Sequence, residues 1–320
     1  MKTLLDRRLA ALALVLSGLL ALPSTLRAQS APGAVKYEPT LKDVRYGKYD
    51  RDVLDVFQVK TVKPAPVLIY YHGGGWLGGD KKDVNPEPIL KRGIAVVAAD
   101  YRFTTGTPDA APFPAPMLDS ARVVQFVRSK AKEWNIDPNR IALTGSSAGA
   151  VICMWIAYHD DLAKPASPDP VERFSTRVTC VLPQSGPSTL DPQLILKRIG
   201  GDHSVTGALL PFYGVKSFDE LDAPDKQKLV ADASAINHVT KNAPPTFMQY
   251  VFPLGGTPLP ENTPINNSIH HPEFGVMLKE KLDAAGVENF LQTAGDGSDP
   301  QAMWTFLVKH LKPDAVPAAK

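Results

Sequence analysis

Cysteine is scarce in this chain: only Cys153 and Cys180 occur among 320 residues. Two cysteines exclude a small domain built on a disulfide framework. Both lie in strongly apolar stretches, where a free thiol behaves as a small hydrophobic side chain. We therefore expect two buried thiols, although a Cys153–Cys180 bridge stays open because a sequence supplies no geometry.

Long hydrophobic runs are also lacking. The run Leu9–Leu22 holds 14 apolar or small residues, whereas a membrane-spanning helix needs about 20. It follows a positively charged start and ends at Pro23, and the sequence Leu-Arg-Ala at 26–28 provides a cleavage site. These features predict a signal peptide over residues 1–28 and a secreted or periplasmic protein without a stable membrane anchor. A short buried helix is the alternative.

Neither sign of charge is in large excess. The chain has 35 basic and 33 acidic residues, a formal net charge of +2, and residues 1–28 contribute +3 of it. The remaining chain is thus near neutral, which does not favour nucleic acid or an anionic membrane as partner. The sequence also lacks a phosphate-binding glycine loop and a clustered metal-ligand motif, so we expect no cofactor and no metal.

Short apolar runs rich in β-branched residues alternate with longer helical patterns. Continuous apolar runs are typical of parallel strands covered on both faces. This alternation predicts an α/β fold with a mainly parallel, doubly wound sheet of about eight strands. The predicted strands are Val53–Val59, Val67–Tyr71, Ile94–Ala99, Ile141–Thr144, Val178–Leu182, Thr246–Val251 and Val287–Gln292, and the predicted helices are Pro116–Trp134, Ala148–Tyr158, Pro272–Ala285 and Pro300–Leu311.

The domain boundaries follow from composition. Residues 29–40 are polar and predict a flexible leader, and residues 313–320 predict a frayed tail. Residues 41–312 form one domain, in which the irregular segment 186–245 is expected to be an insertion over the sheet edge. Only about 24 residues separate the cleavage site from Val53, too few for a two-helix lid, so the lid is expected to be minimal.

The segment Gly145-Ser146-Ser147-Ala148-Gly149 has the G-x-S-x-G form. It follows a predicted strand and opens a predicted helix, which is the context that a nucleophile elbow requires. The glycines allow close backbone approach, and the sharp turn lifts the Ser147 hydroxyl clear of the sheet. Ser147 is therefore the candidate nucleophile, and Ser146 sits one position too early.

A second motif, His72-Gly73-Gly74-Gly75, follows the strand Val67–Tyr71. Glycines there let backbone N–H groups face a developing oxyanion, so Gly73 and Gly74, with Ala148, form the candidate oxyanion hole. A glycine-rich turn that needs positive φ is the alternative. We expect His72 to hydrogen-bond locally and shape the loop.

With these two motifs the chain resembles the hormone-sensitive-lipase and BD-FAE-like (feruloyl and acetylxylan esterase) branch of the α/β-hydrolase superfamily. The resemblance covers roughly residues 45–312 and implies the α/β-hydrolase fold and ester hydrolysis. For Asp100, Arg102 and Asp119 we expect structural ion-pair or capping roles in preference to catalysis. Further matching segments are Asp100-Tyr101-Arg102, Phe113-Pro114-Ala115, Ile136–Ile141 and Asn242–Thr246.

The resemblance breaks at the catalytic acid and base. The acid usually follows the strand equivalent to 246–251, but Thr257 stands near its place and Glu261 is the nearest carboxylate. The base usually follows the strand equivalent to 287–292, but residues 293–299 contain no histidine. A serine hydroxyl needs an adjacent base, so the base must come from elsewhere.

The pair His270-His271 opens a helix after the acid-bearing loop. His271 is the first candidate base and His270 the second, with Glu261 or Asp191 as the orienting acid. An N-cap or packing role is the alternative for this pair.

Two functional hypotheses follow. The first is an exported serine carboxylesterase that acts on short acyl esters, including carbohydrate esters, through a Ser147 acyl-enzyme. The second is a catalytically impaired binding module on an esterase scaffold. Retention of both the elbow and the oxyanion loop favours the first.

Overall fold

The computed structural model describes residues 37–201 and 204–312. The chain divides into a unit that ends at Glu38 and a unit that begins at Pro39, and all helices and strands given below belong to the second. The predicted signal peptide (1–28), most of the leader (29–40) and the tail (313–320) lie outside the described residues. Within the described part, no helix combines the length and apolar character needed to cross a membrane.

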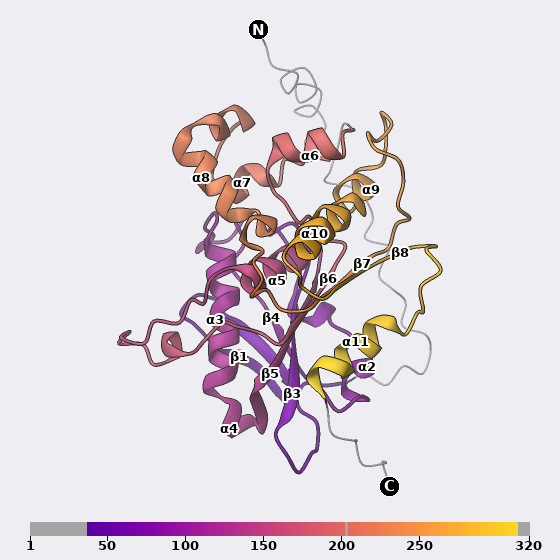
Figure 1. Ribbon diagram of the computed structural model, residues 1–320. Coiled ribbons are helices and arrows are strands. Elements are labelled where there is room, and N and C mark those ends of the chain that lie inside the picture. The colour runs from indigo at the N-terminus through magenta and orange to yellow at the C-terminus, as the bar shows by residue number, and fades with distance from the viewer. Residues whose placement is uncertain (1–36, 202–203, 313–320) are drawn as a thin grey trace. The chain divides into compact units, whose positions relative to one another are not determined.

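An eight-stranded sheet forms the centre of the domain (Figure 1). Its strands are β1 (Leu41–Arg45), β2 (Val53–Phe57), β3 (Ala65–Tyr71), β4 (Ala95–Ala99), β5 (Ile136–Ser146), β6 (Cys180–Gln184), β7 (Thr246–Tyr250) and β8 (Asn289–Thr293). They are ordered β1-β2-β4-β3-β5-β6-β7-β8. Strand β2 runs antiparallel to its neighbours β1 and β4, and the other pairs are parallel. This confirms the predicted sheet.

Two strands differ from the prediction. Strand β1 was not predicted, because its sequence Leu-Lys-Asp-Val-Arg is mostly polar. It lies at the sheet edge with its residues half-buried or exposed, where a continuous apolar run is not needed. Strand β5 begins at Ile136, five residues before the predicted Ile141, because Ile136 pairs with Ala65 of β3 across a register shift.

Helices cover both faces of the sheet, with α3 and α5 on one side and α2 and α11 on the other (Figure 1). The predicted helix Pro116–Trp134 is divided at Lys130, whose φ of −96° and ψ of 0° leave the helical region. The main helices are α2 (Glu87–Leu90), α3 (Ala115–Ser129), α4 (Ala131–Trp134), α5 (Ala148–Tyr158), α9 (Ile265–Ile269), α10 (Glu273–Ala284) and α11 (Ala302–Leu311), with the short η1 (Lys81–Asp83) and η2 (Val171–Arg173) between them.

The core lies around the central strands and α5. Every residue of β4 and of α5 is buried, as the nearly all-round apolar sequence of α5 predicts. Cys153 and Cys180 are free and buried, which agrees with the expected thiols. Burial raises the pKa of Cys180 to about 12 and that of Cys153 well above its usual value, so both stay protonated at neutral pH.

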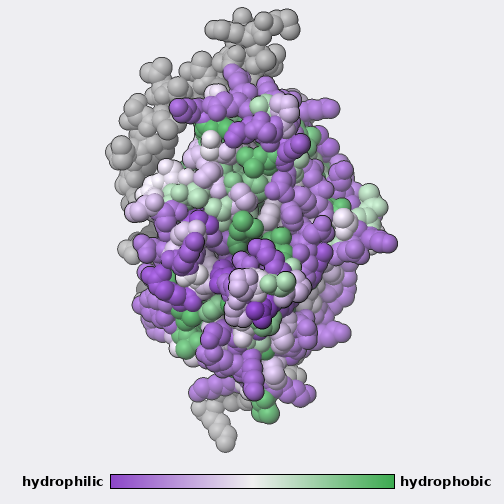
Figure 2. Space-filling model, turned by 90° about the vertical axis from the view of Figure 1, so that its left-hand side faces the viewer, coloured by the Kyte–Doolittle hydropathy of each residue, from purple (hydrophilic) through white to green (hydrophobic). Residues whose placement is uncertain are grey.

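Segment 186–245 contributes α6 (Pro192–Arg198), α7 (Leu209–Tyr213), η3 (Phe218–Asp222), α8 (Pro224–Ala233) and η4 (Ala235–His238). In Figure 1, α6, α7 and α8 lie beyond one end of the central strands. Figure 2 shows the face over α3 and α8, which is mainly hydrophilic with small, separate hydrophobic patches.

Candidate active site

Ser147 lies on a sharp turn between β5, which ends at Ser146, and α5, which begins at Ala148. Its φ of 53° and ψ of −117° are unusual for a residue with a side chain, and such strain is typical of functional positions. Its N–H donates to Gln184 O on the neighbouring strand β6 at 3.0 Å. The turn therefore holds the Ser147 hydroxyl at the carboxyl edge of the sheet, as a nucleophile elbow does.

The two glycines of the motif permit this turn. A Cβ atom on Gly149 would lie 2.1 Å from the carbonyl oxygen of Tyr71, and one on Gly145 would lie 2.6 Å from the same oxygen. Strand β3 therefore passes too close to the turn for any side chain at either position.

The loop after β3 lies directly against Ser147. A Cβ atom on Gly73 would lie 3.5 Å from Ser147 Cβ and 3.0 Å from Ser146 O. Gly74 and Gly75 have φ values of +98° and +61°, which glycine adopts readily. The loop thus brings its backbone beside Ser147, next to Ala148 at the N-terminus of α5, where the first helical N–H groups have no intrahelical partner.

His72 fixes this loop. Its ring is fully buried. Nδ1 donates to Gly73 O at 2.7 Å, and Nε2 accepts from Arg51 Nη2 at 3.1 Å. The ring stacks on Tyr101 at 4.3 Å between centroids, and the Tyr101 hydroxyl donates to His72 O at 2.8 Å. Burial lowers the pKa of His72 to about 4, so the ring is neutral and shapes the loop, as expected.

The charged residues behind the loop form ion pairs. Arg102 Nε lies 2.7 Å from Asp119 Oδ2, and its Nη2 lies 2.8 Å from Asp119 Oδ1. Arg51 Nη2 lies 3.2 Å from Asp100 Oδ1, and burial raises the pKa of Asp100 to about 6. The structural role expected for Asp100, Arg102 and Asp119 is confirmed.

His270 is the side chain that reaches Ser147. Its Nε2 lies 2.9 Å from Ser147 Oγ, across 123 residues of sequence. His270 caps the C-terminus of the short helix α9, directly before α10. The histidine thus comes from the segment after β7, where the sequence resemblance implied the catalytic acid.

The other nitrogen of His270 contacts Asn266, one turn earlier in the chain. His270 Nδ1 lies 2.9 Å from Asn266 Oδ1. A carbonyl oxygen only accepts, so Nδ1 carries the proton and Nε2 can accept from the Ser147 hydroxyl. Burial lowers the pKa of His270 below its usual value.

The other predicted acid and base residues lie elsewhere. His271 is buried, and its Nδ1 accepts from the N–H of Glu273 at 3.2 Å, so it caps the start of α10. Glu261 is exposed in the turn before α9. Asp191 caps α6 by accepting from Gln193 and Leu194 N–H groups. The structure brings Ser147 together with His270, and its hydrogen bonds connect His270 to Asn266 instead of to a carboxylate.

The sequence did not point to Asn266, because a carboxylate is the usual partner of a histidine base and Asn266 is an amide. The available signal was its position four residues before His270, since side chains at this spacing share one side of a helix.

A cavity of about 370 Å³ opens beside Ser147 and His270. The loop Gly73–Trp76 and Ala148 form one wall. The remaining lining is mostly apolar and comes largely from segment 186–245 and from α9 and α10; it includes Pro187, Leu190, Ile195, Leu209, Ile269 and Phe274. This volume suits a small ligand with an apolar part.

Comparison with known proteins matches the BD-FAE family to residues 54–250. Carboxylesterase NlhH of Mycobacterium tuberculosis is 30% identical over 226 residues, which are 69% of this chain and 62% of NlhH. An esterase of Gibberella moniliformis is 37% identical over 108 residues, 32% of this chain and 33% of that protein. The chain thus spans less than two thirds of the length of these relatives.

Solved structures show the same fold. A truncated carbohydrate esterase from gut microbiota has a TM-score of 0.67 at 20% identity, with 88% of this chain and 100% of that one covered. An acetyl ester-xyloside bifunctional hydrolase from Caldicellulosiruptor lactoaceticus has a TM-score of 0.60 at 24% identity, with 81% and 84% covered. Both likenesses concern the fold of the domain.

Proposed function

Because the chain belongs to the BD-FAE family and has the α/β-hydrolase fold, we propose that it is a carboxylic ester hydrolase with Ser147 as nucleophile. One observation carries the proposal: Ser147 Oγ, on a strained elbow, lies 2.9 Å from His270 Nε2. A nucleophile within hydrogen-bond reach of an oriented base is the arrangement that acyl transfer needs. A scaffold kept only for binding has no need of it.

In the acylation step, Ser147 Oγ attacks the ester carbonyl carbon while His270 Nε2 takes the hydroxyl proton. The carbonyl oxygen gains negative charge, which N–H groups of Gly73, Gly74 and Ala148 stabilise. The tetrahedral intermediate collapses, the bond to the alcohol breaks, and His270 returns the proton to the leaving oxygen. Asn266 holds the His270 ring in the tautomer that this transfer requires.

In the deacylation step, water attacks the acyl-enzyme with His270 as base, and the carboxylic acid leaves as Ser147 regains its proton. Asn266 carries no charge, so it supports the imidazolium less than a carboxylate would. The proposed assembly is a Ser147–His270–Asn266 triad, in which a neutral amide takes the place of the acid.

The proposed substrates are short acyl esters. The apolar cavity of about 370 Å³ favours a small acyl group, and the carbohydrate esters handled by two similarly folded proteins support a sugar as the leaving alcohol. We also propose export, on the basis of the signal-like residues 1–28. Mass spectrometry of the mature N-terminus after expression in a bacterial host tests the export.

The catalytic proposal is tested with a fluorophosphonate, which labels activated serines, and with turnover of nitrophenyl acetate. Wild-type protein should gain one label and hydrolyse the ester, whereas Ser147→Ala should do neither. Ser146→Ala is the matched control, because this serine adjoins the nucleophile, and it should still be labelled. Wild-type protein that is folded but neither labelled nor active would overturn the proposal.

A further inference from the structure

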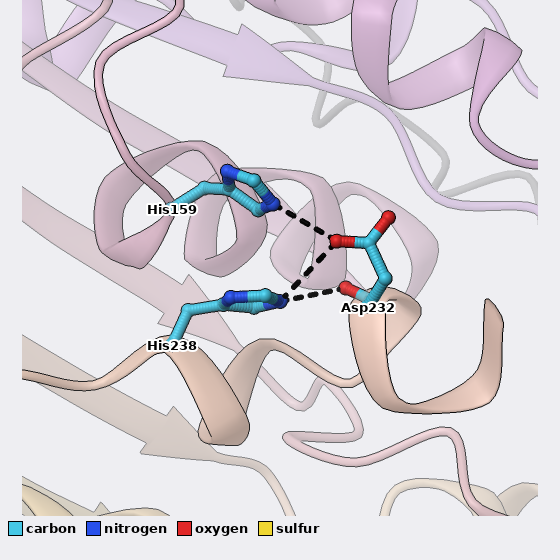
Figure 3. A group of neighbouring side chains, drawn as sticks. All are labelled: His159, Asp232 and His238. Atoms are coloured by element: carbon cyan, nitrogen blue, oxygen red, sulfur yellow. Dashed lines mark hydrogen bonds and ion pairs between the residues drawn. The ribbon is translucent and has the colours of Figure 1, made fainter. Parts of the chain in front are cut away.

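A second group of chemistry-bearing side chains lies apart from the active site (Figure 3). It consists of His159, which caps the C-terminus of α5, Asp232 in the last turn of α8, and His238 at the end of η4. His159 and Asp232 are 73 residues apart in sequence. This distance explains why the sequence shows no ligand motif: the fold alone gathers the group.

The three side chains converge on one point. His159 Nε2 lies 2.9 Å from Asp232 Oδ1, and His238 Nε2 lies 3.7 Å from the same oxygen. The candidate ligand atoms all lie within 4.8 Å of one another. Ligand atoms about 2.0–2.2 Å from a tetrahedral zinc ion are separated by roughly 3.3–3.6 Å. Small side-chain rotations therefore suffice to place all three around an ion.

The two imidazole rings are held in this orientation by packing. Their centroids lie 4.3 Å apart, and the ring of His159 also rests against Trp155 at 4.4 Å. Trp155 Nε1 donates to the backbone oxygen of Asp232 at 3.0 Å, which fixes the end of α8 against α5. Both Nε2 atoms consequently point to the Asp232 carboxylate (Figure 3).

We propose that His159, Asp232 and His238 bind a divalent transition-metal ion, with Zn²⁺ as the preferred ion. Two imidazoles and one carboxylate suit Zn²⁺ and its neighbours, whereas Mg²⁺ and Ca²⁺ prefer oxygen ligands. The side chains are 21%, 43% and 22% exposed, respectively, so an ion can enter from solvent and keep a water as its fourth ligand.

The ion would have a structural role. His159 follows Ser147 by twelve residues along α5, which is about 18 Å at the helical rise, too far for contact with a substrate carbonyl. Bound there, the ion joins the nucleophile helix to α8 and η4, which belong to the segment that lines the cavity. The inference does not depend on the proposed hydrolase activity.

The existing hydrogen bonds set the expected affinity. His238 Nε2 also donates to Asp232 O at 2.8 Å, so metal binding must replace this bond. His159 Nδ1 is buried without a hydrogen-bond partner among the described residues, although metal-bound histidines usually donate through their other nitrogen. Loss of such support costs about 10–100-fold in affinity, so we expect micromolar binding.

The proposal is tested by calorimetry. Full-length protein is first freed of metal with a chelator and then titrated with ZnCl₂. We expect one equivalent to bind to wild-type protein, and His159→Gln and His238→Gln to weaken that binding about tenfold or more. His310→Gln is the matched control, because His310 also lies beside a carboxylate, that of Glu288, and it should bind as wild type does. If Zn²⁺ were bound at His270 instead, its affinity would be unchanged in all three variants, and the proposal would be overturned.

A second measurement guards against variants that fold poorly. Asp232→Asn keeps an oxygen that accepts from His159 but removes the charge, so the fold should persist. The thermal unfolding midpoint should rise with Zn²⁺ in wild-type protein and rise clearly less in Asp232→Asn at the same Zn²⁺ concentration. Wild-type protein that binds no Zn²⁺, or variants that bind it equally well, would show that the group is only a hydrogen-bonded clamp and overturn the proposal.

Discussion

Asn266 Oδ1 accepts a hydrogen bond from His270 Nδ1 at 2.9 Å, on the side of the ring away from Ser147. The partner of the proposed base is thus a neutral amide on an exposed residue. It can fix the ring and its tautomer, but it adds no negative charge to stabilise the imidazolium.

His270→Ala should lower turnover of nitrophenyl acetate almost as far as Ser147→Ala, because nucleophile and base act as one unit. Loss of either in a working triad costs on the order of 10⁶ in kcat. The double variant should be hardly slower than either single one. His271→Ala is the matched control and should remain active, since its ring caps α10. An active His270→Ala together with an inactive His271→Ala would reverse the assignment.

Asn266→Ala should lower kcat by about tenfold, the equivalent of one oriented hydrogen bond of roughly 1.4 kcal/mol. Asn266→Asp should raise kcat, because a carboxylate favours the imidazolium that forms in the transition state. Steady-state kinetics of both variants checks this. Asn267→Ala is the control, because neighbouring helical residues point about 100° apart. An Asn266→Ala enzyme with wild-type kcat would remove Asn266 from the triad.

On the acid side of its pH profile, kcat/KM should fall with a midpoint below pH 6.5; this fall is the acid limb. The base must be neutral to accept a proton, so activity is lost as the pH falls through the pKa of His270. Burial lowers that pKa from its ordinary 6.5, and the limb moves down with it. In Asn266→Asp the added charge should move the limb to higher pH. A wild-type limb above pH 6.5 would contradict a buried base.

Acetyl to butyryl nitrophenyl esters should react faster than long-chain esters, since the cavity measures about 370 Å³. Leu209→Ala removes side-chain volume from its wall and should shift the preference toward longer chains. Leu118→Ala, an exposed position on α3, is the control and should leave the profile unchanged. Thermal unfolding verifies that Leu209→Ala is folded before the rates are compared. Preference of the wild type for long chains would contradict a small acyl pocket.

The fold could be predicted from local sequence because its elements carry local signals. The β-branched runs of β3 and β4 and the all-round apolar sequence of α5 fix a buried parallel sheet with covering helices. Strand β1 was not predicted from the sequence. As an exposed edge strand it needs no apolar run, and it forms its backbone hydrogen bonds with β2.

The position of the candidate nucleophile could also be predicted from local sequence. The G-x-S-x-G motif around Ser147 stands between a buried strand and a buried helix. In this context the small residues predict a sharp turn that exposes the serine hydroxyl. A Cβ atom on Gly149 would lie 2.1 Å from the carbonyl oxygen of Tyr71, which explains why this position needs glycine. The sequence alone thus determined the parallel core of the sheet, the sharp turn at Ser147 and the glycine loop beside it.

Only the tertiary structure chose between His270 and His271. Adjacent residues at the junction of α9 and α10 project in different directions, so one ring meets Ser147 and the other caps a helix. Their one-residue spacing carries no information about which ring points where. The same limit applies to Asn266, and to His159 and Asp232, whose meeting depends on how α8 packs against α5. Contacts between distant segments are set by packing of the whole domain, which local patterns do not encode.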